Sequence, residues 1–173
     1  NQFVPAFGLK AFRRPLTNDE QLTYKTLFAQ GSDITQGTQF VIQAMLSSTH
    51  FLYRTELGEN GILTQYEVAS LLSYTFLGST PDAVLLEKAK NNLLTSNVQL
   101  EAQASRLMQS PLAQAQFARF AEQWLEVESI AQYKDASGYP NYSTQLGEAM
   151  DEEFELFMGK ALTSTTTGVD HLF

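Results

Sequence analysis

Charged side chains that could take part in acid–base or electrostatic chemistry recur beside apolar positions in this chain. Six of them are candidates for a buried polar network: Arg13, Arg14, Arg54, Glu67, Asp82 and Glu153. Glu153 follows Met150 by three residues and precedes Phe157 by four, so it lies at the edge of an apolar helix stripe. A carboxylate in such a place must be paired or protonated. We expect one of the arginines to form a bidentate ion pair with Glu153 or Glu67 that fixes helix docking, in preference to a catalytic acid.

Groups that drive nucleophilic chemistry are scarce. The sequence has no cysteine and only two histidines, His50 and His171. Neither accompanies a nucleophile motif such as Gly-x-Ser-x-Gly, so no catalytic residue is assigned. We expect His50 to be a capping or surface residue.

A cluster of carboxylates near the C-terminal end could in principle bind a cation. Glu148, Glu152 and Glu155 share one helix face, with Asp151 beside them. Oxygen ligands suit Ca²⁺ or Mg²⁺, but neither loop carbonyls nor the Glu-x-x-His pattern of a di-metal bundle accompanies them. The sequence favours a solvated acidic face and no metal site.

Three tyrosines mark the longest irregular connection, residues 129–142. Tyr133, Tyr139 and Tyr142 are candidates for binding, because loops carry function more often than helices do. They could stack on a glycan or dock a partner. Alternatively, they pin a long loop onto the helices.

Charge and hydropathy argue against two classes of partner. The net charge is −8 and no basic patch exists, so nucleic acid and anionic membrane surfaces are poor partners, and no nucleic acid partner is expected. No apolar run approaches the roughly 20 residues that a membrane-spanning helix needs, so membrane insertion is not expected.

Helix signals that would position these residues repeat along the whole chain. Thr17 with Glu20 and Thr64 with Glu67 form two capping boxes. The helix that follows Thr64 is apolar nearly all round, which predicts a central, buried position. Thr80 is the expected N-cap of the next helix, with Pro81 and Asp82 in its first turn.

Two apolar stripes are expected to build the C-terminal core. One runs through Ala113, Phe117, Phe120, Trp124 and Val127 at three- and four-residue steps, and its aromatic residues have the spacing of core residues. The other lies on a last helix over residues 143–162.

The expected fold is all-α, an irregular helical bundle of about seven or eight helices with no sheet. The Gly-containing segment 58–61 suggests a boundary between an N-terminal helical subdomain, residues 1–60, and a larger helical subdomain, residues 61–173, packed against it.

Several strings occur together in a familiar order. They are Ala11-Phe12-Arg13-Arg14-Pro15-Leu16-Thr17, Phe51-Leu52-Tyr53-Arg54, Tyr66-Glu67-Val68-Ala69-Ser70, Leu72-Ser73-Tyr74, Pro81-Asp82, Gln123-Trp124-Leu125, and Met150 with Glu153. With them the chain resembles the pair of adjoining domains of unknown function found in planctomycete-type, cytochrome-c-associated secreted proteins. It departs from their pattern at Leu71, where arginine is usual.

The resemblance implies an extracytoplasmic location, periplasmic or secreted, and a longer parent polypeptide of which this chain is a fragment. It implies haem elsewhere in that parent, with no cofactor in this chain. The expected partners are other domains of the same polypeptide, and a glycan or a haem-bearing partner.

Two kinds of function fit these observations. The favoured one is a non-catalytic helical scaffold or docking module. The alternative is part of a polysaccharide-active or oxidative enzyme, with acids from Glu67, Asp82 or Glu153 and its remaining groups outside this chain. Whether the chain is enzymatic stays open at this point.

Overall fold

Helices account for the regular structure of the protein. The computed structural model describes residues 2–127 and 137–163; within these ranges it has nine helices and no strand, and Glu59 and Ile62 form one isolated bridge. The predicted all-α class is therefore confirmed. None of the helices in these ranges is long and apolar enough to cross a membrane.

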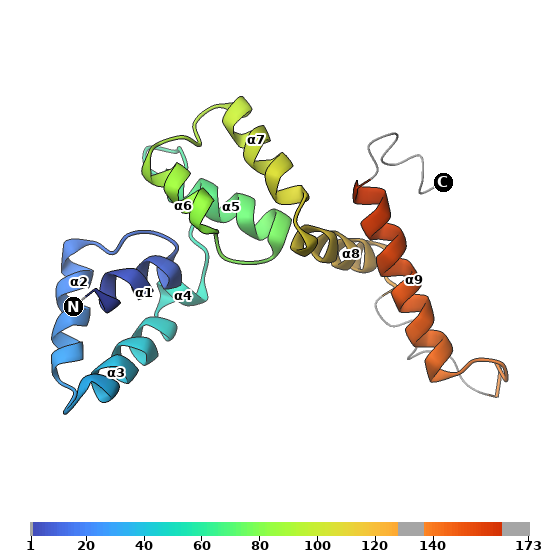
Figure 1. The fold of residues 1–173 in the computed structure, drawn as a ribbon, viewed down its shortest axis with the longest axis horizontal. Helices are drawn as coiled ribbons and strands as arrows, with labels where there is room; N and C mark the ends of the chain where they lie inside the picture. Colours follow the sequence, from blue (N-terminus) through green and yellow to red (C-terminus); the bar gives the residue numbers. More distant parts are fainter. Residues whose placement is uncertain (1, 128–136, 164–173) are drawn as a thin grey trace. The chain divides into compact units, whose positions relative to one another are not determined.

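The helices follow one another with short connections over most of the chain (Figure 1). In order they are α1 (Phe3–Phe12), α2 (Asn18–Ala29), α3 (Ile34–Leu46), α4 (Thr49–Leu52), α5 (Gln65–Leu77), α6 (Ala83–Lys90), α7 (Asn97–Met108), α8 (Pro111–Leu125) and α9 (Thr144–Thr163). The chain divides into two compact units, one of Asn1–Tyr74 with Ser79–Leu100 and the other of Thr75–Gly78 with Glu101–Phe173, so that α5 and α7 each contribute to both.

The core of the first unit is built by the N-terminal helices. Its buried residues are Val4, Ala11, Phe12, Leu16, Val41 and Met45. Partly buried aromatic side chains, including Phe3, Phe28 and Phe51, pack around them. Figure 1 shows α1 to α4 gathered near the N-terminus, in blue to cyan.

Side-chain caps begin most of these helices. Both predicted capping boxes are present: the Thr17 hydroxyl accepts from the backbone N–H of Glu20 at 3.2 Å, and the Thr64 hydroxyl accepts from that of Glu67 at 3.3 Å. The expected N-cap at Thr80 is wrong. The side chain of Asp82 accepts from the backbone N–H of Leu85 at 2.8 Å, so Asp82 is the cap and α6 begins after it.

Helix α5 is less buried than its composition predicted. Its fully buried residues are the small ones, Ala69, Ser70 and Ser73, whereas large residues such as Leu72 and Phe76 are half-buried. The prediction that α5 is buried on all sides is therefore wrong, because its large apolar residues remain partly open to solvent. Small residues form the inward face, and the larger ones spread over its margins.

The core of the second unit is thin. Ala118 and Ala121 of α8 pack with Met158 of α9, and Phe117 and Phe154 cover them in part. The prediction that the aromatic stripe of α8 lies in the core is wrong at two positions, because Phe120 is 57 % exposed and Trp124 is 69 % exposed. Alanines, which allow a close approach of two helices, take the inward face instead.

Candidate functional site

The guanidinium of Arg13 binds backbone carbonyls. Arg13 directly follows α1, has a left-handed backbone with a φ of 60°, and is only 6 % exposed. Its Nη2 donates to the carbonyls of His50 at 2.6 Å and Tyr53 at 2.9 Å. Its Nη1 donates to the carbonyls of Ala11 and Phe51, each at 3.4 Å. The side chain therefore joins α1 to the carbonyl end of α4, where backbone acceptors lack helix partners.

Arg14 and Glu20 form the bidentate ion pair of this unit. Nη1 and Nη2 of Arg14 each lie 2.8 Å from a different carboxylate oxygen of Glu20. Glu20 also accepts the backbone N–H of Thr17 at 2.8 Å, and Nε2 of His50 lies 3.6 Å from its Oε1. The hydrogen bond from Arg14 outweighs the effect of burial and lowers the pKa of Glu20 to about 2, with a smaller contribution from Thr17. The same bond raises the pKa of Arg14.

Arg54 lies nearer to solvent and contacts an aromatic ring. Its Nη2 is 2.9 Å from Oε1 of Glu56, and both side chains are 39 % exposed. Its guanidinium carbon lies 5.6 Å from the ring centroid of Tyr74, and that of Arg13 lies 5.9 Å from the same centroid. The Tyr74 ring therefore contacts two cations, an arrangement that the ring quadrupole favours.

Glu67 closes the loop that precedes α5. Its Oε1 accepts the backbone N–H groups of Leu57 at 3.0 Å and Gly58 at 3.1 Å. Its Oε2 accepts both the backbone N–H and the hydroxyl of Thr64 at 2.8 Å. Burial alone would raise the pKa of Glu67, but these hydrogen bonds together lower it. The carboxylate is saturated by local donors and needs no arginine.

Four residues of the predicted polar network meet around one small cavity. Its lining residues are Phe12, Arg13, Arg14, His50, Arg54, Thr55, Tyr66, Glu67 and Ser70. The cavity holds about 30 Å³. That volume is far below the roughly 300–1,000 Å³ of small-molecule sites, so no substrate-sized group fits among these charges.

The two remaining members of that network lie elsewhere. Asp82 caps α6, as described above. Glu153 is exposed on α9, and within the described part of the chain its carboxylate has no ion pair or hydrogen bond. The expected pair between an arginine and Glu153 or Glu67 is therefore wrong. Glu153 lies at the edge of the apolar stripe of α9. The face of α9 that packs against α8, which includes Phe154 and Met158, is narrower than that stripe, so Glu153 faces solvent.

The other candidate residues are only partly described. Tyr133 lies outside the described residues, as does His171. Tyr139 is 57 % exposed, and Tyr142 is half-buried with its backbone N–H donating to the carbonyl of Tyr139 at 2.9 Å. The acidic residues of α9, Glu148, Asp151, Glu152 and Glu155, are exposed, and the described residues contain no group of three potential metal ligands.

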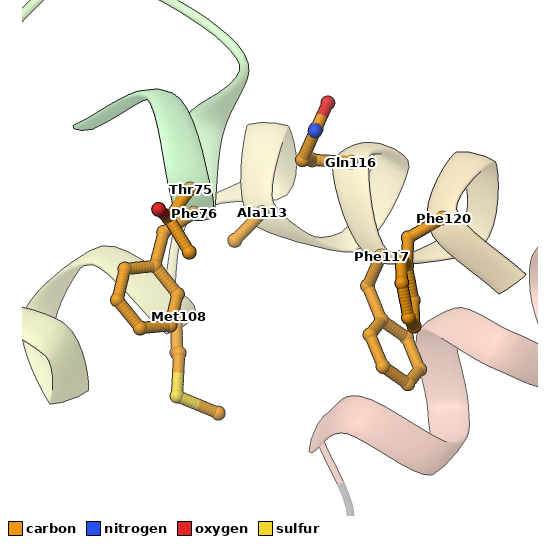
Figure 2. Close-up of a pocket in the computed structure, with 7 residues that line it drawn as sticks. All are labelled: Thr75, Phe76, Met108, Ala113, Gln116, Phe117 and Phe120. Atoms are coloured by element: carbon orange, nitrogen blue, oxygen red, sulfur yellow. The ribbon is translucent and has the colours of Figure 1, made fainter. Parts of the chain in front are cut away.

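A larger cavity lies within the second unit and is lined mainly by apolar groups. It holds about 390 Å³, and its lining residues are Thr75, Phe76, Met108, Ala113, Gln116, Phe117 and Phe120. Figure 2 shows Phe76 and Met108 on one side, the rings of Phe117 and Phe120 on the other, and Ala113 between them. The volume lies within the roughly 300–1,000 Å³ typical of small-molecule sites, and no charged side chain lines the cavity.

An exposed aromatic pair adjoins this cavity. The rings of Phe120 and Trp124 stack with centroids 6.2 Å apart and an angle of 18° between their planes. The sequence did not identify this site, because helical spacing predicts that residues share a face without showing whether that face is filled. Thr75 and Gln116 are the two lining residues with polar side chains. The Gln116 amide oxygen lies about 2.5 Å from the point where a Cβ atom on Gly78 would be.

Comparisons with known proteins identify the family. Residues 63–173 match the model of PSD4, described as protein of unknown function (DUF1592), and residues 1–56 match that of PSD5, described as protein of unknown function (DUF1595). Comparison with curated proteins gave no match, and comparison with solved structures gave none. The chain therefore belongs to the DUF1592 family of proteins of unknown function, with an adjoining DUF1595 domain before it.

Proposed function

We propose that the chain is a non-catalytic helical docking module of a larger exported, cytochrome-c-associated polypeptide. The observation that carries the proposal is the small cavity among Arg13, Arg14, Arg54 and Glu67, which holds about 30 Å³. An acid–base or carboxylate-pair mechanism needs such groups beside a space that admits substrate. Here the convergent charges enclose too little space for one.

The hydrogen bonds of the same residues support a structural role. Arg13 donates to four backbone carbonyls, and Glu67 accepts three backbone N–H groups and one hydroxyl. Arg14 and Glu20 satisfy each other and the start of α2. Charges engaged in this way hold helix ends and connections in place, and their removal is expected to unfold the unit before it alters any reaction.

Exposed apolar side chains on α8 and α9 support docking. Large residues that remain open to solvent there include Leu112, Leu125, Leu146, Leu156 and Phe157. Helices α8 and α9 pack against each other, so these side chains belong to one helix pair, and exposed apolar surface of this kind is a candidate interaction site. The occupant that we propose is another domain of the same parent polypeptide, with haem carried outside this chain and the assembly located in the periplasm or secreted.

Binding to the rest of the parent tests the docking role. The remaining parent polypeptide and this chain would be expressed separately, mixed, and examined by analytical ultracentrifugation. We expect a one-to-one complex that Leu156→Ser weakens and Leu22→Ser does not, because Leu22 is comparably exposed but lies on α2. No complex at concentrations of about 1 mM would contradict docking, since linked domains meet at effective concentrations of about that order.

Activity of the assembled protein tests the non-catalytic role. Glu67→Gln in the full-length parent should lower the melting temperature. It should leave any glycan-directed or haem-linked turnover unchanged when measured well below that temperature. A selective loss of turnover in a folded variant would instead favour the enzymatic alternative.

A further inference from the structure

We propose that the 390 Å³ cavity of the second unit binds an uncharged, planar, ring-containing small molecule. The site is formed by the end of α5, the end of α7 and the first three turns of α8. It is separate from the charged cluster of the first unit, and the proposal does not depend on the proposed function.

The walls select for an apolar ring. Phe76 stands opposite Phe117 and Phe120 across the cavity, and the thioether of Met108 lies below Phe76 (Figure 2). Aromatic groups favour offset or edge contacts with other rings, and methionine sulfur adds a favourable contact with ring edges. A flat group placed between these walls gains both kinds of contact.

The cavity disfavours a charged ligand. No ionisable residue lines the cavity, and the amide of Gln116 points away from the two phenylalanine rings of α8 (Figure 2). An ionised group placed there would lose water without gaining a partner of opposite charge. An anion would also meet a chain with a net charge of −8.

Two small residues, Gly78 and Ala113, lie at or beside the cavity. Gly78 ends the α5 segment with a φ of 60°, and the Gln116 side chain occupies the space beside it where any larger residue would project. Ala113, only 3 % exposed, lies between the two walls and keeps the cavity open because its side chain is one methyl group. Enlarging that residue should therefore fill the site.

The test uses 1-naphthol as a neutral probe and 1-naphthalenesulfonate as its charged counterpart, with the full chain and calorimetry. We expect saturable 1-naphthol binding with a dissociation constant on the order of 0.1–1 mM, as the small size of the probe allows. The sulfonate should bind at least about tenfold more weakly. Absence of saturable 1-naphthol binding, or equal binding of both probes, would overturn the proposal.

Matched variants locate the binding. Ala113→Leu should weaken 1-naphthol binding about tenfold or more, whereas Ala115→Leu, the same change at an exposed position of α8, should leave it within about twofold. Equal binding by all three proteins would show that the probe binds elsewhere. If Ala113→Leu lowers the helical content, the exposed wall residue Phe120 offers a second variant, Phe120→Ala, which should still weaken binding several-fold.

The methionines give an independent readout. The chain has four, and Met108 lines the cavity while Met45, Met150 and Met158 do not. With ¹³C-methyl methionine, 1-naphthol should shift the Met108 signal through its ring current and leave that of Met45 in place. A Met108 signal that stays fixed at saturation would contradict the assignment.

Discussion

Arg14 and Glu20 meet through two parallel hydrogen bonds of 2.8 Å, and the same carboxylate completes the capping box of α2. One carboxylate therefore serves an ion pair and a helix start together. Its low pKa, about 2, arises chiefly from the hydrogen bond with Arg14. The pair thus links the segment after α1 to α2.

Replacing this carboxylate should give a pH-dependent loss of stability. Glu20→Gln is expected to lower the free energy of unfolding by about 1 kcal/mol at pH 7, because it removes the ion pair with Arg14 while the amide oxygen can still accept from Thr17. The folded pKa of Glu20 is depressed from 4.5 to about 2, so its contribution is complete above pH 4.5 and is lost as the pH falls towards 2. Urea unfolding of the parent and the variant at pH 7 and pH 3 measures this difference in stability.

Glu56→Gln, at the exposed pair with Arg54, is the control and should change little. A difference between Glu20→Gln and the parent that does not shrink at pH 3 would contradict the ion-pair explanation.

Arg13 should not tolerate lysine. Lysine keeps the charge but loses the planar fork that reaches four carbonyls, and hydrogen bonds to charged groups contribute about 1.5–3 kcal/mol each. Arg13→Lys is therefore expected to cost about 2 kcal/mol or more in chemical unfolding. Arg54→Lys, at an exposed ion pair, should cost less than about 0.5 kcal/mol. If the two substitutions lower the free energy of unfolding equally, the carbonyl contacts of Arg13 contribute no more than the exposed ion pair of Arg54.

Two serines of α5 should respond differently to replacement by alanine. The Ser73 hydroxyl is fully buried and has no hydrogen-bond partner among the described residues. Ser73→Ala is expected to raise the free energy of unfolding by about 1 kcal/mol, since it removes an unsatisfied buried group. The Ser70 hydroxyl donates to the carbonyl of Tyr66 at 2.8 Å, so Ser70→Ala should be neutral or destabilising. A loss of stability in Ser73→Ala would mean that its hydroxyl has an acceptor in solution.

Two helical glycines should also differ. A methyl group on Gly37 would collide with the carbonyl oxygen of Phe28, a backbone atom that cannot move aside. Gly37→Ala should therefore destabilise the α2–α3 pair, although alanine is the better helix former. At Gly159 the nearest atoms would be 3.9 Å away, and Gly159→Ala should add about 0.5–1 kcal/mol. Thermal melts followed by circular dichroism distinguish them, and a higher melting temperature for Gly37→Ala would contradict the close approach.

Local signals allowed the helices to be predicted well. The capping boxes of Thr17 and Thr64 depend on residues three positions apart, so sequence alone determines them. The predicted start of α6 was two residues too early. Asp82 is as good an N-cap as Thr80, and Pro81 can stand before a helix as well as at its first position. Such competition between neighbouring caps is resolved by the tertiary fold.

The site was harder to predict for a different reason. Phe120 and Trp124 have the spacing of core residues, but Ala118 and Ala121 face α9 instead. Periodicity identifies a shared face, and only packing decides which face is covered. The partners of the charged residues were equally hard to predict. Glu67 accepts hydrogen bonds from its own loop, whereas Arg13 donates to the carbonyls of His50 and Tyr53, far along the sequence.

The carbonyl contacts of Arg13 also bear on folding during synthesis. Its partners at His50 and Tyr53 leave the ribosome 37 and 40 residues after it. Until then, burying this side chain would strip water from a cation that has too few acceptors. Closure of α1 over Arg13 should therefore wait for Tyr53, so that the first four helices become protected in a single step. Ribosome-bound chains stalled before and after that point should differ sharply in their resistance to protease.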